Sequence, residues 1–119
     1  MLTEAEAREF AHRWIDTWNS HDLEAILALY AEDVVLTSPV ATRVLHEPSG
    51  KVEGKEALRN YFQRGLAAHP QLNFRFIEEM RGLASVVVCY INHNGEKCAE
   101  FMELAPDGKV RRVVANYRD

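Results

Sequence analysis

The chain is poor in the features that mark several large classes of protein. It has only two cysteines among its 119 residues, too few for a disulfide framework, so we expect both to be reduced thiols. No apolar run approaches the ~20 residues of a membrane-spanning helix, which excludes an integral membrane protein of that kind. Residues 1–6 lack a basic region followed by an apolar stretch, so the sequence predicts no secretory signal and a cytoplasmic location.

A basic surface and a metal-binding motif are also lacking. Fourteen Lys and Arg stand against 18 Asp and Glu, a net charge of −4, and no basic block interrupts the sequence. Binding to nucleic acid through phosphate neutralisation is therefore not expected. The five histidines show no HxH or HExxH spacing, so we expect neither a metal nor a cofactor. Only His46 is kept, as a remote acid–base candidate.

What the sequence does contain is enough for one folded domain over residues 1–119. Hydrophobic residues make up 47% of the chain, and at this length roughly two thirds of the unfolded surface can be buried. The sequence has no internal repeat, low-complexity tract or linker. A single hydrophobic core is therefore expected, without a metal or a disulfide to hold it together.

The first third of the chain has helical periodicity. Thr3 and Glu6 form a capping box, and the apolar residues that follow recur at steps of three and four. A second short helix is expected to place Leu23, Ile26, Leu27 and Tyr30 on one face. A third helix is expected from near Lys55 to just before Pro70.

The rest of the chain reads as β-structure. A strand over 34–37 is expected to stop at Ser38-Pro39, and residues 40–54 are expected to form a small irregular hairpin. The later strands are predicted at 72–79, 85–92, 97–104 and 110–117. Helices followed by an antiparallel sheet indicate the α+β class.

The dipeptide Asn94-Gly95 predicts a two-residue hairpin turn and with it a register. If His93 faces Glu96, the strands align so that alternate residues share a face. One face is then predicted to hold Val87, Cys89, Ile91, Cys98, Glu100, Met102 and Leu104. The other face is predicted to hold Val86, Val88, Tyr90, Ala99 and Phe101.

Both predicted faces are apolar at their centres, which is unusual for an antiparallel sheet with one wet face. The helices are long enough to cover only one side of the sheet. The second cover is predicted to be another copy of the chain. The sequence thus predicts a homodimer through the face that contains Val86, Val88, Tyr90 and Phe101.

Glu100 is the single carboxylate on its predicted face. Burial disfavours the charged form, so the pKa of Glu100 should be raised. A carboxylic acid that is neutral at pH 7 can donate a hydrogen bond or act as a general acid or base. The alternative is a glutamate at the rim of the sheet, reaching solvent or paired with an arginine.

Several segments resemble the nuclear transport factor 2-like superfamily, in particular its SnoaL-like and ketosteroid-isomerase-like members. The resembling stretches are WIDTWNSHDL at 14–23, ALYAEDVV at 28–35 and VEGKEAL at 52–58. The resemblance covers essentially the whole chain. It implies a cone-shaped, cystatin-like α+β fold in which three N-terminal helices pack on a curved antiparallel or mixed sheet. A deep apolar pocket and dimers through the sheet are also implied.

The resemblance also assigns positions within that pocket. The isomerases' general-base aspartate, which precedes a proline after the first strand, corresponds to Ser38. Their phenol donor on the first helix corresponds to Trp14, and their second acid corresponds to Glu100. Further candidates for lining the pocket are Trp18, Tyr30, Tyr61, Phe62, Cys89, Cys98 and Met102, although aromatic side chains on helical stripes of this kind are more often simply core.

Two functions follow as hypotheses. The first is a dimeric protein whose pocket binds a small hydrophobic, cyclic metabolite and transforms it by isomerisation, cyclisation or hydrolysis, with Glu100 as acid or base. The second is a binding or dimerisation module that keeps the fold without catalysis. Ser38 in place of aspartate favours the second hypothesis, and Glu100 on an apolar face favours the first.

Overall fold

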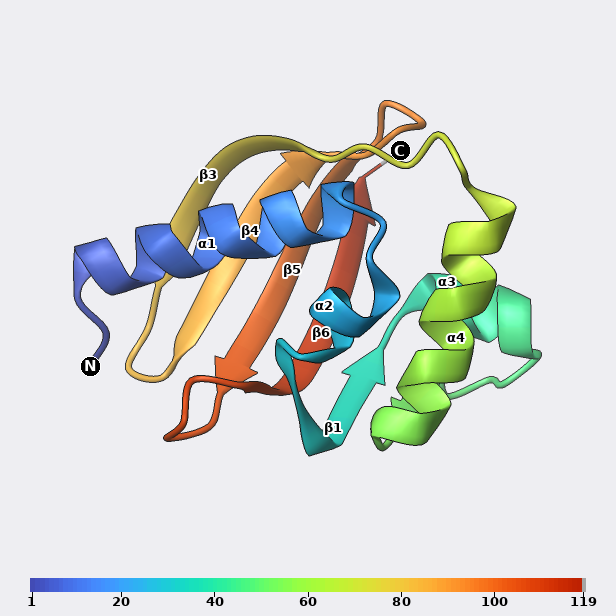
Figure 1. The fold of residues 1–119 in the computed structure, drawn as a ribbon, viewed down its shortest axis with the longest axis horizontal. Coiled ribbons are helices and arrows are strands. Elements are labelled where there is room, and N and C mark those ends of the chain that lie inside the picture. The colour runs from blue at the N-terminus through green and yellow to red at the C-terminus, as the bar shows by residue number, and fades with distance from the viewer. Residues whose placement is uncertain (119) are drawn as a thin grey trace.

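The fold is described from a computed structural model that covers residues 1–118. The helices and strands, in chain order, are α1 (Glu4–Asn19), α2 (Leu23–Leu27), β1 (Tyr30–Thr37), α3 (Pro39–Leu45), β2 (Lys51–Glu53), α4 (Lys55–Ala68), β3 (Arg75–Arg81), β4 (Ser85–Ile91), β5 (Lys97–Leu104) and β6 (Val110–Arg118). The predicted α+β class is confirmed. Figure 1 shows α1 lying across the strands, with α4 beside it over the other end of the sheet.

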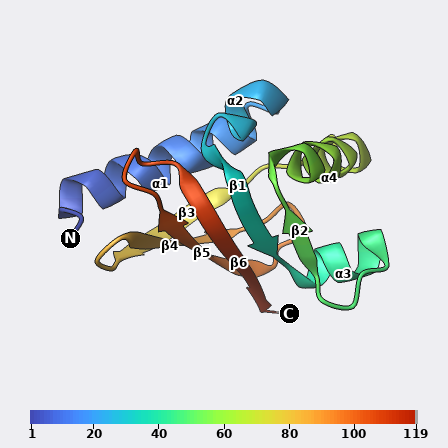
Figure 2. The ribbon, with the colours of Figure 1, turned by 90° about the horizontal axis from the view of Figure 1, so that it is seen from below.

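One curved sheet contains all six strands in the order β2-β1-β6-β5-β4-β3. β1 and β6 are parallel and the other neighbouring pairs are antiparallel. Figure 2 shows α1, α2 and α4 on one side of this sheet, and within residues 1–118 no helix lies across the opposite side. We call these the inner and the outer face.

The N-terminal helices form as their sequence predicts, with one exception. Thr3 and Glu6 make both bonds of the capping box, and Asp22 caps α2 by accepting from the backbone N–H of Ala25. The exception is Tyr30, which we expected on the face of the second helix. α2 ends at Leu27, and Tyr30 is the first residue of β1, paired with Val110 of β6.

The expected hairpin over residues 40–54 is wrong. Ser38 is an N-cap whose hydroxyl accepts from the N–H of Val40, and Pro39 takes the first helical position, where its missing N–H costs nothing. These two residues therefore end β1 and begin α3. Only the short strand β2 remains of the predicted hairpin, and it pairs with β1.

The first strand of the later sheet begins at Arg75 instead of at residue 72. Asn19, at the end of α1, exchanges two hydrogen bonds with the backbone of Phe74, at 2.9 and 2.7 Å. The His21 ring bonds the carbonyl of Leu72 at 2.8 Å. Side chains of the α1–α2 connection thus take the backbone groups that a longer strand would have used.

The hairpin register is wrong by one residue. The turn holds three residues, because the N–H of Asn92 bonds the carbonyl of Glu96 at 2.9 Å. The Asn92 side chain accepts from the N–H groups of Asn94 and Glu96, and Gly95 has a φ of 80°. Val88 therefore faces Glu100, whereas the two-residue turn had paired Glu100 with Cys89.

Because of this shift, each residue of β4 lies on the face opposite to the predicted one, whereas the residues of β5 lie on the predicted faces. Val86, Val88 and Tyr90 are fully buried in the core under the helices, on the same face as Glu100. Three of the four residues assigned to the dimer interface thus lie inside the chain, and only Phe101 lies on the outer face. Cys89 moves the other way, to the outer face.

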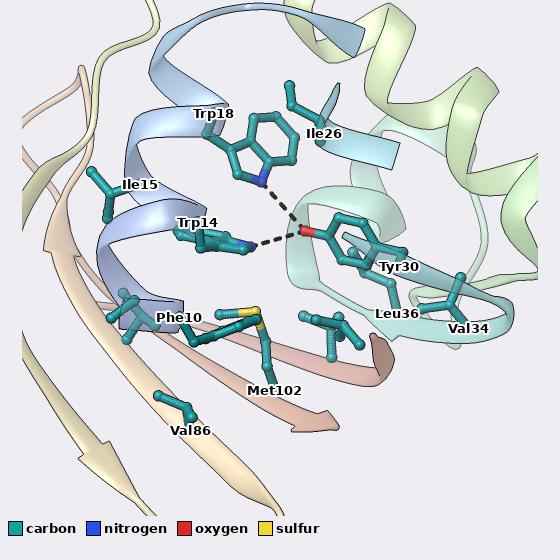
Figure 3. Close-up of a cluster of buried hydrophobic side chains, with 14 of the residues drawn as sticks. Phe10, Trp14, Ile15, Trp18, Ile26, Tyr30, Val34, Leu36, Val86 and Met102 are labelled. Carbon is teal, nitrogen blue, oxygen red and sulfur yellow. Dashed lines mark hydrogen bonds between the residues drawn. The ribbon is translucent and has the colours of Figure 1, made fainter. Parts of the chain in front are cut away.

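The core lies between the inner face and the helices. Its largest fully buried side chains include Trp14, Tyr30, Tyr90 and Met102, several of which Figure 3 shows around one another. Among residues 1–118, no helix is long and apolar enough to cross a membrane.

Candidate functional site

A cavity of about 350 Å³ is lined by side chains of α1, α3, α4 and the inner face of the sheet. Aromatic and apolar side chains make up most of its wall, and the buried Glu100 belongs to it. The lining residues discussed below are Trp14, Trp18, Tyr30, Ser38, Arg43, Tyr61, Phe62, Arg64, His69, Phe74, Tyr90, Asn92, His93, Glu96, Glu100 and Tyr117. A volume of this size suits a small organic molecule.

The tryptophans are held in place by a buried hydroxyl. The indole N–H groups of Trp14 and Trp18 both donate to the Tyr30 oxygen, at 3.0 and 3.3 Å, as Figure 3 shows. Phe74 stacks on Trp14, with 5.8 Å between the ring centroids. Burial, and then the charge of Glu100, raises the pKa of Tyr30, so this phenol is a neutral hydrogen-bonding group.

Glu100 is the acidic group of the cavity. Its side chain projects from β5 on the inner face, the residue is only 9% exposed, and the Tyr90 hydroxyl donates to its Oε1 at 2.9 Å. Burial raises the pKa of Glu100 to about 7, partly offset by the bond from Tyr90. At neutral pH this carboxyl can therefore give up a proton or take one.

Ser38 lies at the junction of β1 and α3 and is 3% exposed. It is close to the phenols of Tyr61 and Tyr117, where its hydroxyl offsets part of the rise that burial causes in both phenols' pKa. Because the Ser38 oxygen already accepts from the backbone of Val40, it serves as a cap and a polar wall. No imidazole or amine within hydrogen-bonding distance activates it as a nucleophile among the described residues.

The mouth of the cavity carries the cationic and imidazole side chains. Arg43 of α3 and Arg64 of α4 are exposed, and the Arg64 guanidinium donates to the carbonyl of Val44 at 3.4 Å. His69 and His93 face each other with 4.8 Å between ring centroids. Burial, and then the neighbouring His69, lowers the pKa of His93, and neither ring nitrogen of His93 has a hydrogen-bond partner within residues 1–118.

The structure brings together most of the residues that the sequence nominated. Ser38 and Glu100 share the cavity with Trp14, Trp18, Tyr30, Tyr61 and Phe62. Cys98 and Met102 are buried on the same face of the sheet but do not line the cavity. Cys89 lies on the outer face, away from the cavity, because of the register shift, and His46 is outside it as the left-handed C-cap of α3.

Sequence reasoning missed the partner of Glu100 and the basic mouth. Tyr90 was assigned to the opposite face by the same register error. Arg43 could not be placed while residues 40–54 were expected to form a hairpin, and Arg64, on the predicted third helix, then had no α3 to lie against. The signal for α3 was present, since a serine followed directly by proline is a common way to begin a helix.

No cation site accompanies this acid. Within residues 1–118, no group of three or more His, Cys, Asp or Glu side chains is placed to hold a metal ion. The two cysteines are not bonded to each other. The chemistry that the described side chains offer is proton transfer at Glu100 and hydrogen bonding from Tyr90 and the other phenols.

The curved mixed sheet, which packs against helices and encloses an aromatic cavity with them, has the nuclear transport factor 2-like, or cystatin-like, fold of solved structures that it resembles. The family model of the SnoaL-like domain matches residues 11–115. The chain belongs to the SnoaL-like family. The resemblance seen in the sequence is thus confirmed.

Solved structures agree with this assignment. A SnoaL-like protein of unknown function from Burkholderia thailandensis is 37% identical, with a TM-score of 0.95 and 98% of each chain covered. SalBIII, an epoxide hydrolase/cyclase-like enzyme with a role in pyran ring formation in the polyether salinomycin, is 21% identical, with a TM-score of 0.78. The match covers 99% of this chain and 95% of the SalBIII chain.

A further solved structure shares the fold. A putative ketosteroid isomerase from Kribbella flavida is 23% identical at a TM-score of 0.74, covering 95% of this chain and 78% of its own. Below 25% identity, this structure and SalBIII show a shared fold and nothing finer. No protein with a curated function matched the sequence.

Proposed function

We propose that the protein binds a small hydrophobic, cyclic metabolite in the cavity and transforms it by acid–base chemistry at Glu100. The observation that carries this proposal is a buried carboxyl, bonded by one phenol, that forms part of the wall of an aromatic cavity. Trp14, Trp18 and Phe74 supply flat apolar surface for a ring system.

The carboxyl is suited to both directions of proton transfer. A group whose pKa is about 7 is present in both protonation states at neutral pH, so it can protonate one position of a substrate and recover a proton from another. Isomerisation, ring closure and hydrolysis all need such a step. Tyr90 stays hydrogen-bonded to the carboxylate while the proton is away.

Native mass spectrometry of freshly purified protein is the first test. A releasable molecule of a few hundred daltons would supply a ligand class and a substrate to assay, and we expect Glu100→Gln to retain that ligand while losing its conversion. Phe62→Leu, a change in the apolar wall, is the matched control and should weaken binding more than it slows conversion of the bound molecule. Full turnover by Glu100→Gln would overturn the acid–base role.

A second candidate function is ligand binding without catalysis. It is favoured by Ser38, which stands where the resembling isomerases have a base and whose oxygen is occupied as a helix cap. A binding protein would hold a ligand unchanged over hours, in wild type and in Glu100→Gln alike. Conversion by wild type alone would reject this candidate.

We further propose that a second copy of the chain covers the outer face. Val87, Ile91, Phe101 and Val114 are only half-buried there, and Met80 is 53% exposed. Charges of both signs surround this apolar centre, so a two-fold axis would set acidic groups against basic ones. The side chains concerned are Glu78, Lys97, Glu103 and Arg112.

Sedimentation velocity tests the dimer. Phe101→Glu places a charge at the centre of the outer face, and we expect it to convert a dimer to a monomer. Leu83→Glu is the control, because Leu83 is 78% exposed in the β3–β4 turn and should leave the dimer intact. A monomeric wild type, or a Phe101→Glu dimer, would refute the interface.

A further inference from the structure

We propose that the ligand is an organic anion, a carboxylate attached to the cyclic apolar body, and that Arg43 and Arg64 bind this carboxylate at the mouth of the cavity. This inference rests on the proposed function, since it names the class of molecule that occupies the same cavity. It is carried by the position of the two arginines on the cavity wall and by their lack of an acidic partner within residues 1–118.

Five of the 14 basic side chains are paired with a carboxylate in the part of the chain that the structure describes, and the two arginines are among those that are not. Within residues 1–118, Arg8, Lys55, Arg59, Arg81 and Arg111 all lie within 4.0 Å of a carboxylate. Arg43 and Arg64 do not, although the chain carries a net charge of −4. Two cations left unpaired in an acidic protein, both on the wall of one cavity, provide a site for an anion.

Both arginines line the cavity, Arg43 from α3 and Arg64 from α4. Arg64 lies one helical turn after Tyr61 on α4 and is anchored by its bond to the carbonyl of Val44 on α3. Burial raises the pKa of Tyr61, and Arg43 lies close enough to this phenol for its charge to offset part of that rise. The two arginines and Tyr61 thus form one patch along the α3–α4 side of the mouth.

The polarity of the cavity gives the ligand a direction. The floor consists of Trp14, Tyr30 and Glu100, which are buried, whereas the two arginines are exposed. A molecule with an apolar ring at the floor and a carboxylate at the mouth satisfies both regions. Arginine is suited to this contact, because its planar fork of N–H donors matches a carboxylate with two parallel bonds.

The other side of the mouth restricts where the anion can lie. Glu96 lines it with a carboxylate that accepts from the Asn92 side chain at 3.0 Å, and this negative charge repels an anion toward α3 and α4. His93, whose ring nitrogens are unpartnered, offers one N–H donor even when neutral. An anionic group therefore fits between the arginine patch and His93.

Tryptophan fluorescence gives a direct test, because both tryptophans of the chain line the cavity. The probes are matched acid and amide pairs, cyclohexanecarboxylate with its carboxamide and adamantane-1-carboxylate with its carboxamide. These saturated molecules are transparent where tryptophan absorbs. We expect each acid to bind about tenfold more tightly than its amide, the scale of one charge-assisted hydrogen-bond pair.

Variants assign the preference to the arginines. Arg43→Gln and Arg64→Gln should each remove most of the advantage of the acid while leaving the affinity for the amide unchanged. Arg59→Gln is the control on the same helix, since Arg59 is paired with Glu24 and lies outside the cavity. It should change neither affinity.

Three outcomes would overturn the inference. Equal affinity for acid and amide in wild type would remove the anion from the proposal while leaving the cavity as a binding site. A preference for the acid that survives in the double variant Arg43→Gln/Arg64→Gln would assign it to other groups. Failure of every probe to quench fluorescence would overturn the binding cavity itself, and the proposed function with it.

Discussion

Replacement of Glu100 by glutamine tests the acidic centre through protein stability, without any knowledge of the substrate. The amide has nearly the same shape as the carboxyl and keeps an oxygen that can accept the hydrogen bond from Tyr90. The change removes one property, the ability of a buried group to become charged. Its effect on the free energy of unfolding should therefore depend on pH.

The sign and size follow from the pKa. Glu100 titrates near 7 in the folded protein against an ordinary value of 4.5, so between these values the native state holds a proton that the unfolded chain releases. The contribution of Glu100 to the stability of wild type is therefore largest below pH 4.5 and falls as the pH rises to 7. The total loss from this one group is about 3 kcal/mol, at about 1.4 kcal/mol for each pKa unit.

Urea unfolding at pH 5 and pH 8 provides the assay. The difference in unfolding free energy between Glu100→Gln and wild type should grow by roughly 2–3 kcal/mol across this range, in favour of the variant. Taking the difference cancels the titration of all other groups. Glu103→Gln is the control on the same strand, because Glu103 faces outward and pairs with Arg111 at 2.8 Å, and its difference should not rise with pH.

A difference that stays constant, or a variant that is less stable than wild type at pH 8, would refute the reasoning. Either result would mean that Glu100 is ionised in the folded protein and stabilised by its surroundings. A charged carboxylate of that kind would be a structural group. The proton-transfer role proposed for it would then lose its physical basis.

Two further substitutions test the local packing by urea unfolding. Tyr30→Phe leaves two buried indole N–H groups without an acceptor and should cost about 2–5 kcal/mol, whereas Tyr61→Phe, which interrupts no comparable pair, should cost about 1 kcal/mol or less. Gly50→Ala should cost roughly 2 kcal/mol or more, because φ is +66° and a Cβ would lie 2.7 Å from the Ser38 carbonyl. Gly95→Ala, with a φ of +80° and open space, should cost only about 1 kcal/mol.

The matched pairs also define the results that would contradict these expectations. Equal losses for Tyr30→Phe and Tyr61→Phe would show that the indole groups find other acceptors. Equal losses for Gly50→Ala and Gly95→Ala would show that the loop before β2 shifts to admit a methyl group. In both cases the contacts described here would not control stability.

α1, α2, α4 and most of the strand segments could be predicted because their signals are local. Apolar spacing, a capping box and Asn94-Gly95 each act within a few residues. The register could not be fixed in the same way. Whether the turn holds two residues or three depends on the Asn92 side chain, which bonds two backbone N–H groups of its own turn, and an asparagine at that position does not require this conformation.

That one-residue difference also decided how much of the site could be predicted. Glu100 kept its face because the shift moved β4 past β5, whereas Tyr90 and Cys89 exchanged theirs. That Arg43 and Arg64 lie together at the mouth could not be predicted for a different reason, because their placement depends on α3. Ser38-Pro39 can equally stop a strand or begin a helix, and in this chain it does both.

The parallel pairing of β1 with β6 has a consequence for how the protein is made. β1 leaves the ribosome early, yet within the sheet it joins β3, β4 and β5 only through β6, which follows every other strand in chain order. Until β6 emerges, the β1–β2 pair cannot join the sheet formed by β3, β4 and β5. The cavity also lacks Ala115 and Tyr117 until then. The pocket is therefore completed by the last of the six strands to be synthesised, and a nascent chain that stops before residue 110 cannot form it.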